Sequence, residues 1–188
     1  MFSICKNSKY LYEIKKSKFY VLLYKINDTN DVDKFLLEAK KEYKDATHYC
    51  YAYVIDGYSK ASDDGEPSGT AGLPILEVLN KKNLDHILCI VVRYFGGIKL
   101  GAGGLIRAYA NSVTEAINDN EIIELIDGYL VEINESYDNK KEIEYLFKDN
   151  IKEAYYQDKI KYILEIDNLD KVSKYNHKVL KEIKIKKD

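Results

Sequence analysis

The sequence predicts an α+β protein with two domains, and two patterns support this prediction. The first is a buried strand, a glycine loop and a helix over residues 87–117, where the apolar run ILCIVV leads through five glycines into apolar side chains at helical spacing. The second is the order strand, helix, strand, strand, helix, strand over residues 129–185, which is the ferredoxin-like βαββαβ arrangement. We therefore expect a first domain at residues 1–126 and a ferredoxin-like domain at residues 127–188.

The first part of the chain carries sheet and helix patterns. Residues 10–14 and 19–26 alternate or run apolar around a Lys-Lys-Ser-Lys turn, which predicts a hairpin. Asn30 or Asp31 is then placed to cap a helix with one apolar face.

Residues 47–55, THYCYAYVI, predict a strand that places His48 and Cys50 on one side and tyrosines on the other. Two interpretations of His48 and Cys50 are open, a thiolate–imidazole pair or a packed strand face. Same-face neighbours on a strand are about 7 Å apart, and no orienting third residue is close in sequence. We therefore assign no catalytic residue.

Residues 57–74, GYSKASDDGEPSGTAGLP, predict a long loop because they hold both prolines of the chain. Pro74 then suits the first turn of a helix over residues 75–82. The loop gathers carboxylates and hydroxyls at Asp63, Asp64, Glu66, Ser68 and Thr70. Three interpretations are open: a Mg²⁺ site, ordinary turn chemistry, or a surface that recognises a protein partner.

The second domain is predicted element by element. Asp127-Gly128 is expected to be the turn or boundary that precedes it, and Asn168 is expected to cap its second helix. The predicted strands are residues 129–134, 151–156, 160–166 and 182–185, and the predicted helices are residues 139–147 and 169–180.

The glycine loop is the candidate binding site. No Asp or Glu occurs between His86 and Thr114, and the two arginines of the chain, Arg93 and Arg107, both lie there with Lys99 between them. Guanidinium groups bind phosphate in a two-pronged way, and amides at a helix start attract anions. The backbone donors would come from Gly101, Gly103 and Gly104. The alternative is that these glycines serve only close packing and positive φ angles.

Composition narrows the function classes. A net charge of −2 gives no overall attraction to nucleic acid or an anionic membrane, so polyanion binding would have to be local. The three cysteines are far apart and form no metal-ligand pattern, so we expect neither a disulfide framework nor a structural zinc site. We also name no metal ligand and no cofactor. No apolar stretch reaches the length of a membrane span, and we expect a soluble cytoplasmic protein of unknown oligomeric state.

Four motifs in order, EIKKSKF, DATHYCYAYV, SDDGEPSGTAG and VVRYFGGIKLGAGGLIRAYANSV, resemble the YigZ/IMPACT family. The resemblance implies a first domain with the fold shared by a ribosomal protein's second domain and domain four of elongation factor G. It also implies a C-terminal domain like that of bacterial family members, and a role in translation, since IMPACT relatives regulate translation by competing for an activator of the initiation-factor kinase.

Our first hypothesis is accordingly a non-catalytic, translation-associated regulator. It would bind structured RNA, the ribosome or a translation-related protein through the glycine-rich basic loop and helix. The alternative is an enzyme that acts on a phosphate, nucleotide or peptide substrate with Mg²⁺ at the acidic loop. A third hypothesis is a protein-binding adaptor that uses residues 57–74 as its recognition surface.

Overall fold

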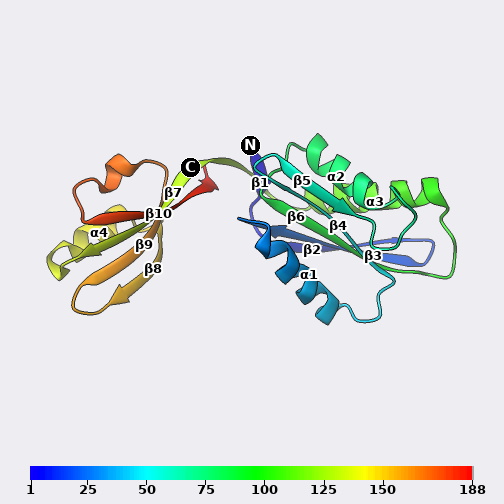
Figure 1. The fold of residues 1–188 in the computed structure, drawn as a ribbon, viewed down its shortest axis with the longest axis horizontal. Coiled ribbons are helices and arrows are strands. Elements are labelled where there is room, and N and C mark those ends of the chain that lie inside the picture. The colour runs from blue at the N-terminus through cyan, green and yellow to red at the C-terminus, as the bar shows by residue number, and fades with distance from the viewer. Residues whose placement is uncertain (188) are drawn as a thin grey trace. The chain divides into compact units, whose positions relative to one another are not determined.

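The computed structural model describes residues 1–187, which form two compact units, residues 1–124 and residues 125–187. Each unit has its own antiparallel sheet and helices, so the mixed α and β character is confirmed (Figure 1). Strand β7 (Ile122–Glu135) begins in the first unit and continues into the second.

The predicted turn at Asp127-Gly128 is wrong, because both residues lie inside β7 and pair with β10. Gly128 is needed there for space. A Cβ atom at this position would lie 2.8 Å from the carbonyl oxygen of Ile166 and 2.8 Å from the side chain of Ile185. The glycine therefore marks a close packing position within a strand instead of a turn.

The first unit is built on a five-stranded antiparallel sheet in the order β2-β3-β6-β4-β5. Its strands are β2 (Ser8–Ile14), β3 (Ser17–Lys25), β6 (Ile87–Tyr94), β4 (His48–Ile55) and β5 (Tyr58–Ser62). The predicted hairpin is confirmed as β2 and β3, which pair from Ser8 opposite Leu23 to Ile14 opposite Ser17. Strand β6 is central because its apolar residues are buried on both faces of the sheet.

Helices cover both faces of this sheet. Helix α1 (Asn30–Glu42) packs on one face, and helices α2 (Gly72–Lys81) and α3 (Ala102–Asn118) pack on the other (Figure 1). The predicted alternation of β4 is confirmed, since Cys50 is buried under α2 and α3 while its tyrosine neighbours pack toward α1. A short strand β1 (Phe2–Ile4) pairs with the start of β7.

The predicted loop over residues 57–74 is too long. Residues 58–62 form β5, which pairs with β4, and α2 begins at Gly72, so the irregular segment is residues 63–71. The sequence YSKAS of β5 has no apolar alternation that would predict a strand. It is an edge strand with exposed side chains, so its backbone pairing with β4 fixes it. We call residues 63–71 the acidic loop.

The second unit has the strand order β10-β7-β9-β8, with all pairs antiparallel. Its remaining elements are the 3₁₀ turn η1 (Tyr137–Asn139), α4 (Lys140–Leu146), β8 (Ile151–Tyr156), β9 (Ile160–Ile166), the 3₁₀ turn η2 (Leu169–Val172) and β10 (His177–Lys186). One face of the sheet packs a core with α4 around Val131, Ile143 and Tyr162.

The predicted helix over residues 169–180 is wrong. Only the single 3₁₀ turn η2 forms, because residues from His177 onward pair with β7 as strand β10. The predicted cap is confirmed, since the Asn168 side chain accepts a hydrogen bond from the backbone of Asp170 at 2.9 Å. No helix within residues 1–187 is long and apolar enough to cross a membrane.

Candidate functional site

A pocket of about 340 Å³ lies in the first unit, where β6 ends and α3 begins, and we call it the α3 pocket. Its walls come from four segments: the start of β4, the acidic loop, the end of β6, and the glycine segment that leads into α3. The volume lies within the range of about 300–1,000 Å³ that is usual for ligand sites. The pocket thus joins the two segments that the sequence singled out.

An ion pair between Arg93 and Glu66 forms the floor of the α3 pocket. The distance from Arg93 Nη1 to Glu66 Oε1 is 2.5 Å, and the two side chains are 6% and 3% exposed. The guanidinium also lies 5.5 Å from the ring centre of Phe19 and 5.7 Å from that of Phe95. Arg93 is therefore held by a carboxylate and two aromatic rings, and its Nε atom has no hydrogen-bond partner among the described residues.

Tyr109 of α3 extends this buried network. Its hydroxyl donates to Glu66 Oε1 at 2.8 Å and lies 3.3 Å from the Cys50 thiol, which also contacts the carbonyl oxygen of Asp63 at 2.9 Å. Burial raises the pKa of Tyr109, and burial raises the pKa of Cys50 to about 12. Both groups are therefore neutral at neutral pH, and Cys50 is a packed, hydrogen-bonded thiol instead of a nucleophile.

The acidic loop is organised by Asp63. Its carboxylate accepts backbone hydrogen bonds from Gly69 at 2.8 Å, Ala71 at 3.0 Å and Gly72 at 2.8 Å. Desolvation acts to raise the pKa of Asp63, but the backbone hydrogen bonds outweigh it, and the pKa is lowered. The charge of Asp63 is thus used to fold the loop and to start α2.

The other predicted loop residues have different surroundings. Asp64 accepts a hydrogen bond from the backbone of Tyr49 at 2.6 Å, and the Thr70 hydroxyl donates to the carbonyl of Pro67 at 2.6 Å. Ser68 is exposed. Residues 1–187 contain no group of three His, Cys, Asp or Glu side chains arranged to hold a metal ion. The structure therefore gives the Mg²⁺ interpretation no support from geometry.

Of the remaining predicted cations, Lys99 lines the α3 pocket, whereas Arg107 lies further along α3 and is not part of the pocket lining. Lys99 and Arg107 are exposed, and neither forms an ion pair with a described residue. Gly101 precedes α3 with φ +73°, and the first amides of a helix have no acceptor within it. Gly103 and Gly104 lie in this first turn, where Gly103 would bring a Cβ to 3.7 Å from Arg107 Nη1. The predicted basic set is thus divided: Arg93 lies in the floor, while Lys99 and Arg107 lie outside it.

Two side chains that the sequence did not assign to this site, His48 and Tyr109, also belong to it, together with Phe95, which the sequence offered as a residue that could stack on an unpaired base or be buried. His48 reaches the pocket from β4, and its Nε2 atom lies 3.8 Å from Glu66 Oε2. Phe95 is 46% exposed at the pocket, and Tyr109 lies beneath it. The strand alternation places His48 on the correct face, but only the fold brings it to a carboxylate from the acidic loop.

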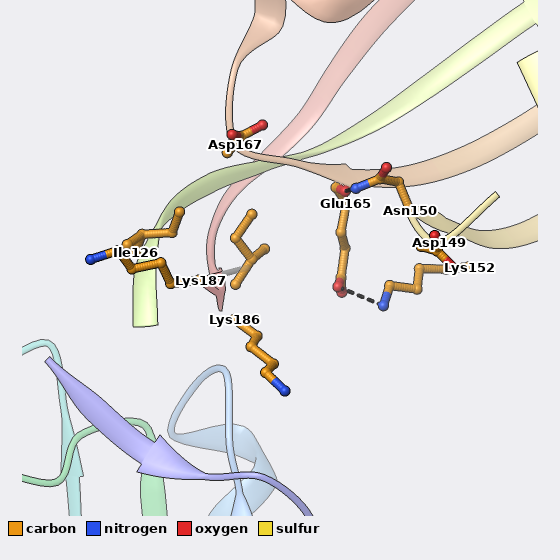
Figure 2. Close-up of a pocket in the computed structure, with 9 residues that line it drawn as sticks. Ile126, Asp149, Asn150, Lys152, Glu165, Asp167, Lys186 and Lys187 are labelled. Atoms are coloured by element: carbon orange, nitrogen blue, oxygen red, sulfur yellow. Dashed lines mark hydrogen bonds and ion pairs between the residues drawn. The ribbon is translucent and has the colours of Figure 1, made fainter. Parts of the chain in front are cut away.

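A second pocket of about 340 Å³ lies in the second unit (Figure 2). Its wall includes Lys152 and Glu165, which form an ion pair at 2.9 Å, and Asn150 donates to the carbonyl of Glu165 at 2.9 Å. Carboxylates and ammonium groups are mixed around it, so the pocket has no single sign of charge. We therefore take the α3 pocket as the candidate site.

The first unit is therefore an α+β domain in which helices cover both faces of an antiparallel sheet. Its defining site is a glycine-led helix that begins beside a buried Arg–Glu pair. Residues 15–117 match the family model described as the Impact N-terminal domain, and this range includes every residue of the α3 pocket. The chain belongs to the Impact N-terminal domain family.

Several known proteins are similar to this chain. IMPACT family member YvyE of Bacillus subtilis is 52% identical over 114 residues, which are 59% of this chain and 52% of that protein. IMPACT family member YigZ of Escherichia coli is 41% identical over 110 residues, which are 56% of this chain and 54% of that protein. The chain thus spans about half the length of the curated relatives that it matches.

A crystal structure described as that of an hypothetical protein has the same fold over most of the chain. It is 28% identical, has a TM-score of 0.65, and covers 95% of this chain and 95% of its own. The likeness therefore extends through both units, beyond the residues that the family model matches.

Proposed function

We propose that this chain is a non-catalytic, translation-associated regulator that binds RNA through the surface beside the α3 pocket that carries Lys99, Arg107 and the first turn of α3. The observation that carries the proposal is the pair of exposed cations, Lys99 and Arg107, beside the open first turn of α3, in a segment without acidic residues. Phosphate groups suit such a surface, because ammonium, guanidinium and free amides all donate to anionic oxygens. The link to translation is what the resemblance to the YigZ/IMPACT family implies, and membership of the Impact N-terminal domain family supports it.

The role of Arg93 in this proposal differs from the role that the sequence suggested. Its guanidinium is committed to Glu66, so it supports the floor of the pocket and does not contact phosphate. Lys99, Arg107 and the amides that follow Gly101 are the phosphate ligands. The acidic loop supports the same pocket through Glu66 and is less suited to be a separate partner surface, because Asp63 and Thr70 serve the loop's own hydrogen bonds.

The test is binding of single-stranded and structured RNA, measured by fluorescence anisotropy at several salt concentrations. The variant Lys99→Ala/Arg107→Ala should weaken binding and reduce the slope of log affinity against log salt for single strands by about 1.4, since each lost phosphate contact contributes about 0.7. The matched control is Lys60→Ala/Lys81→Ala, which removes the same net charge from exposed positions elsewhere in the first unit. Equal effects of both double variants, or no binding by the wild type, would contradict the proposal.

The finer assignments are part of the same proposal. We propose that residues 1–126 are an IMPACT-type domain with the fold shared by the ribosomal protein and domain four of elongation factor G. The order β10-β7-β9-β8 supports a ferredoxin-like second domain over residues 127–188, with η2 in place of the second helix. The cytoplasm is the compartment that a translation-associated role requires. The ribosome or a translation-related protein would be the wider partner.

A further inference from the structure

Two hydrogen-bond acceptors face the α3 pocket with no donor between them. Oε1 of Glu66 accepts from both Arg93 and Tyr109, whereas Oε2 accepts no hydrogen bond from any residue in the described range. Nε2 of His48 lies 3.8 Å from Oε2, which is too long for a hydrogen bond. The carboxylate is 3% exposed, so water reaches it poorly.

The tautomer of His48 follows from its other nitrogen. Nδ1 lies 2.8 Å from the backbone carbonyl oxygen of Asp64, and a carbonyl oxygen can only accept. Nδ1 therefore carries the proton, and in the neutral ring Nε2 presents a lone pair. The pocket thus holds a carboxylate oxygen and an imidazole lone pair side by side. A ligand that fits both offers two hydrogens on one donor atom or on neighbouring donor atoms, as an amino group does.

The rest of the pocket favours a flat body attached to an anion. Phe95 is 46% exposed beside the pocket and lies over the Arg93 guanidinium, while Pro67, Leu100 and Leu105 give apolar walls. Lys99 and the start of α3 lie at the edge. A nucleotide has these three parts: an amino group on the base, an aromatic ring that stacks on a phenyl ring, and a phosphate.

We infer that the α3 pocket takes a single unpaired RNA base that carries an exocyclic amino group, with the amino group between Glu66 Oε2 and His48 Nε2. The base stacks on Phe95, and its backbone phosphate lies toward Lys99 and the first turn of α3. This inference rests on the proposed RNA binding and specifies which nucleotides are preferred. Adenine, cytosine and guanine each carry such an amino group, whereas uracil has none and places a carbonyl oxygen against the two acceptors.

The experiment compares RNA 12-mers that differ by one chemical group. Oligoadenylate is matched with an oligomer of purine riboside, which lacks only the amino group, and oligocytidylate is matched with oligouridylate. Anisotropy titrations at one fixed salt concentration should show roughly tenfold tighter binding of each amino-bearing strand, the effect of about one hydrogen bond to a charged acceptor. Equal affinities of both pairs would overturn the inference and leave phosphate binding intact. No binding of any strand would overturn the proposed function as well.

Substitutions then test which residues cause the preference for bases that carry an amino group. His48→Asn keeps an amide donor in the place of Nδ1 for the Asp64 carbonyl but removes Nε2, so the preference should fall to about threefold, because the Glu66 contact remains. Lys99→Ala is the control, and it should weaken all strands by one common factor without changing the preference. A preference that stays at its wild-type size in His48→Asn would place the base elsewhere and overturn the inference.

A direct readout covers the case in which His48→Asn does not fold. Adding adenosine monophosphate to the isotope-labelled wild type should move the Nε2 resonance of His48 and leave that of His177, in the second unit, unchanged. An unchanged His48 resonance at saturating adenosine monophosphate would refute the contact. A tripeptide with a free amino terminus serves as competitor. If it abolishes the preference and its N-acetylated form does not, the two acceptors bind a peptide amine, and the base inference is wrong.

Discussion

Replacing Arg93 by leucine tests whether this residue is the floor of the pocket or a surface ligand. The side chains of Arg93 and Glu66 are 6% and 3% exposed, so Arg93→Leu leaves a buried carboxylate without its counterion. Breaking a buried ion pair in this way costs about 3–5 kcal/mol of folding free energy. For the 124 residues of the first unit, an unfolding entropy of about 2.1 cal/mol/K per residue converts this to a fall of roughly 12–19 °C in Tm.

The assay is urea unfolding followed by circular dichroism, with calorimetry for Tm. The double variant Arg93→Leu/Glu66→Gln completes the test, because it leaves no buried charge and keeps an acceptor for the Tyr109 hydroxyl. It should be more stable than Arg93→Leu by about 1–2 kcal/mol, as expected when an uncompensated charge is removed. Arg107→Leu is the matched control, and at an exposed position it should change stability by less than about 0.5 kcal/mol.

The reasoning is refuted if Arg93→Leu costs less than about 1 kcal/mol, the range of an exposed ion pair. It is also refuted if the double variant is no more stable than the single one, since Glu66 would then not be the group that Arg93 compensates. Either result would return Arg93 to the set of candidate phosphate ligands.

Three further outcomes follow from the structure. Because the folded pKa of Asp63 is depressed, its stabilising effect is present above the unfolded pKa of about 3.8 and is lost as pH falls through the folded pKa. Asp63→Asn should therefore flatten the acid limb of a curve of unfolding free energy against pH. An unchanged acid limb would contradict the role of the backbone hydrogen bonds to Asp63. Gly96→Ala should destabilise the first unit by at least about 2 kcal/mol in urea unfolding, since a Cβ there would lie 2.0 Å from the backbone of the β2–β3 turn. Mass spectrometry after brief alkylation at pH 8 should show modification at Cys5 alone in the folded protein and at Cys50 and Cys89 only in denaturant, because burial raises the pKa of both buried thiols; rapid native labelling of Cys50 would disagree with its buried position.

Several elements of the fold are determined by local sequence. The β2–β3 hairpin, strand β6 and helix α3 were all predicted, because the period of apolar residues and the turn residues between them are properties of neighbouring positions. The glycine segment before α3 and the cations around it were also predicted from local sequence. The sequence alone therefore located one wall of the α3 pocket.

Other elements were decided by partners far away in the chain. Residues 177–180 were predicted as the end of a helix and residues 182–185 as a strand, yet all of them belong to β10 because β7 offers an edge to pair with. The polar residues of β5 form a strand for the same reason.

The α3 pocket shows most clearly what local sequence patterns could not predict. Arg93 and Glu66 are 27 positions apart, and each, read alone, is an exposed charge by residue type. Their burial together, with Tyr109 and His48 beside them, exists only when β4, β6, α3 and the acidic loop are assembled. Local pattern sets which segments become helix or strand, whereas the pairing of buried charges depends on distances that only the packed chain defines.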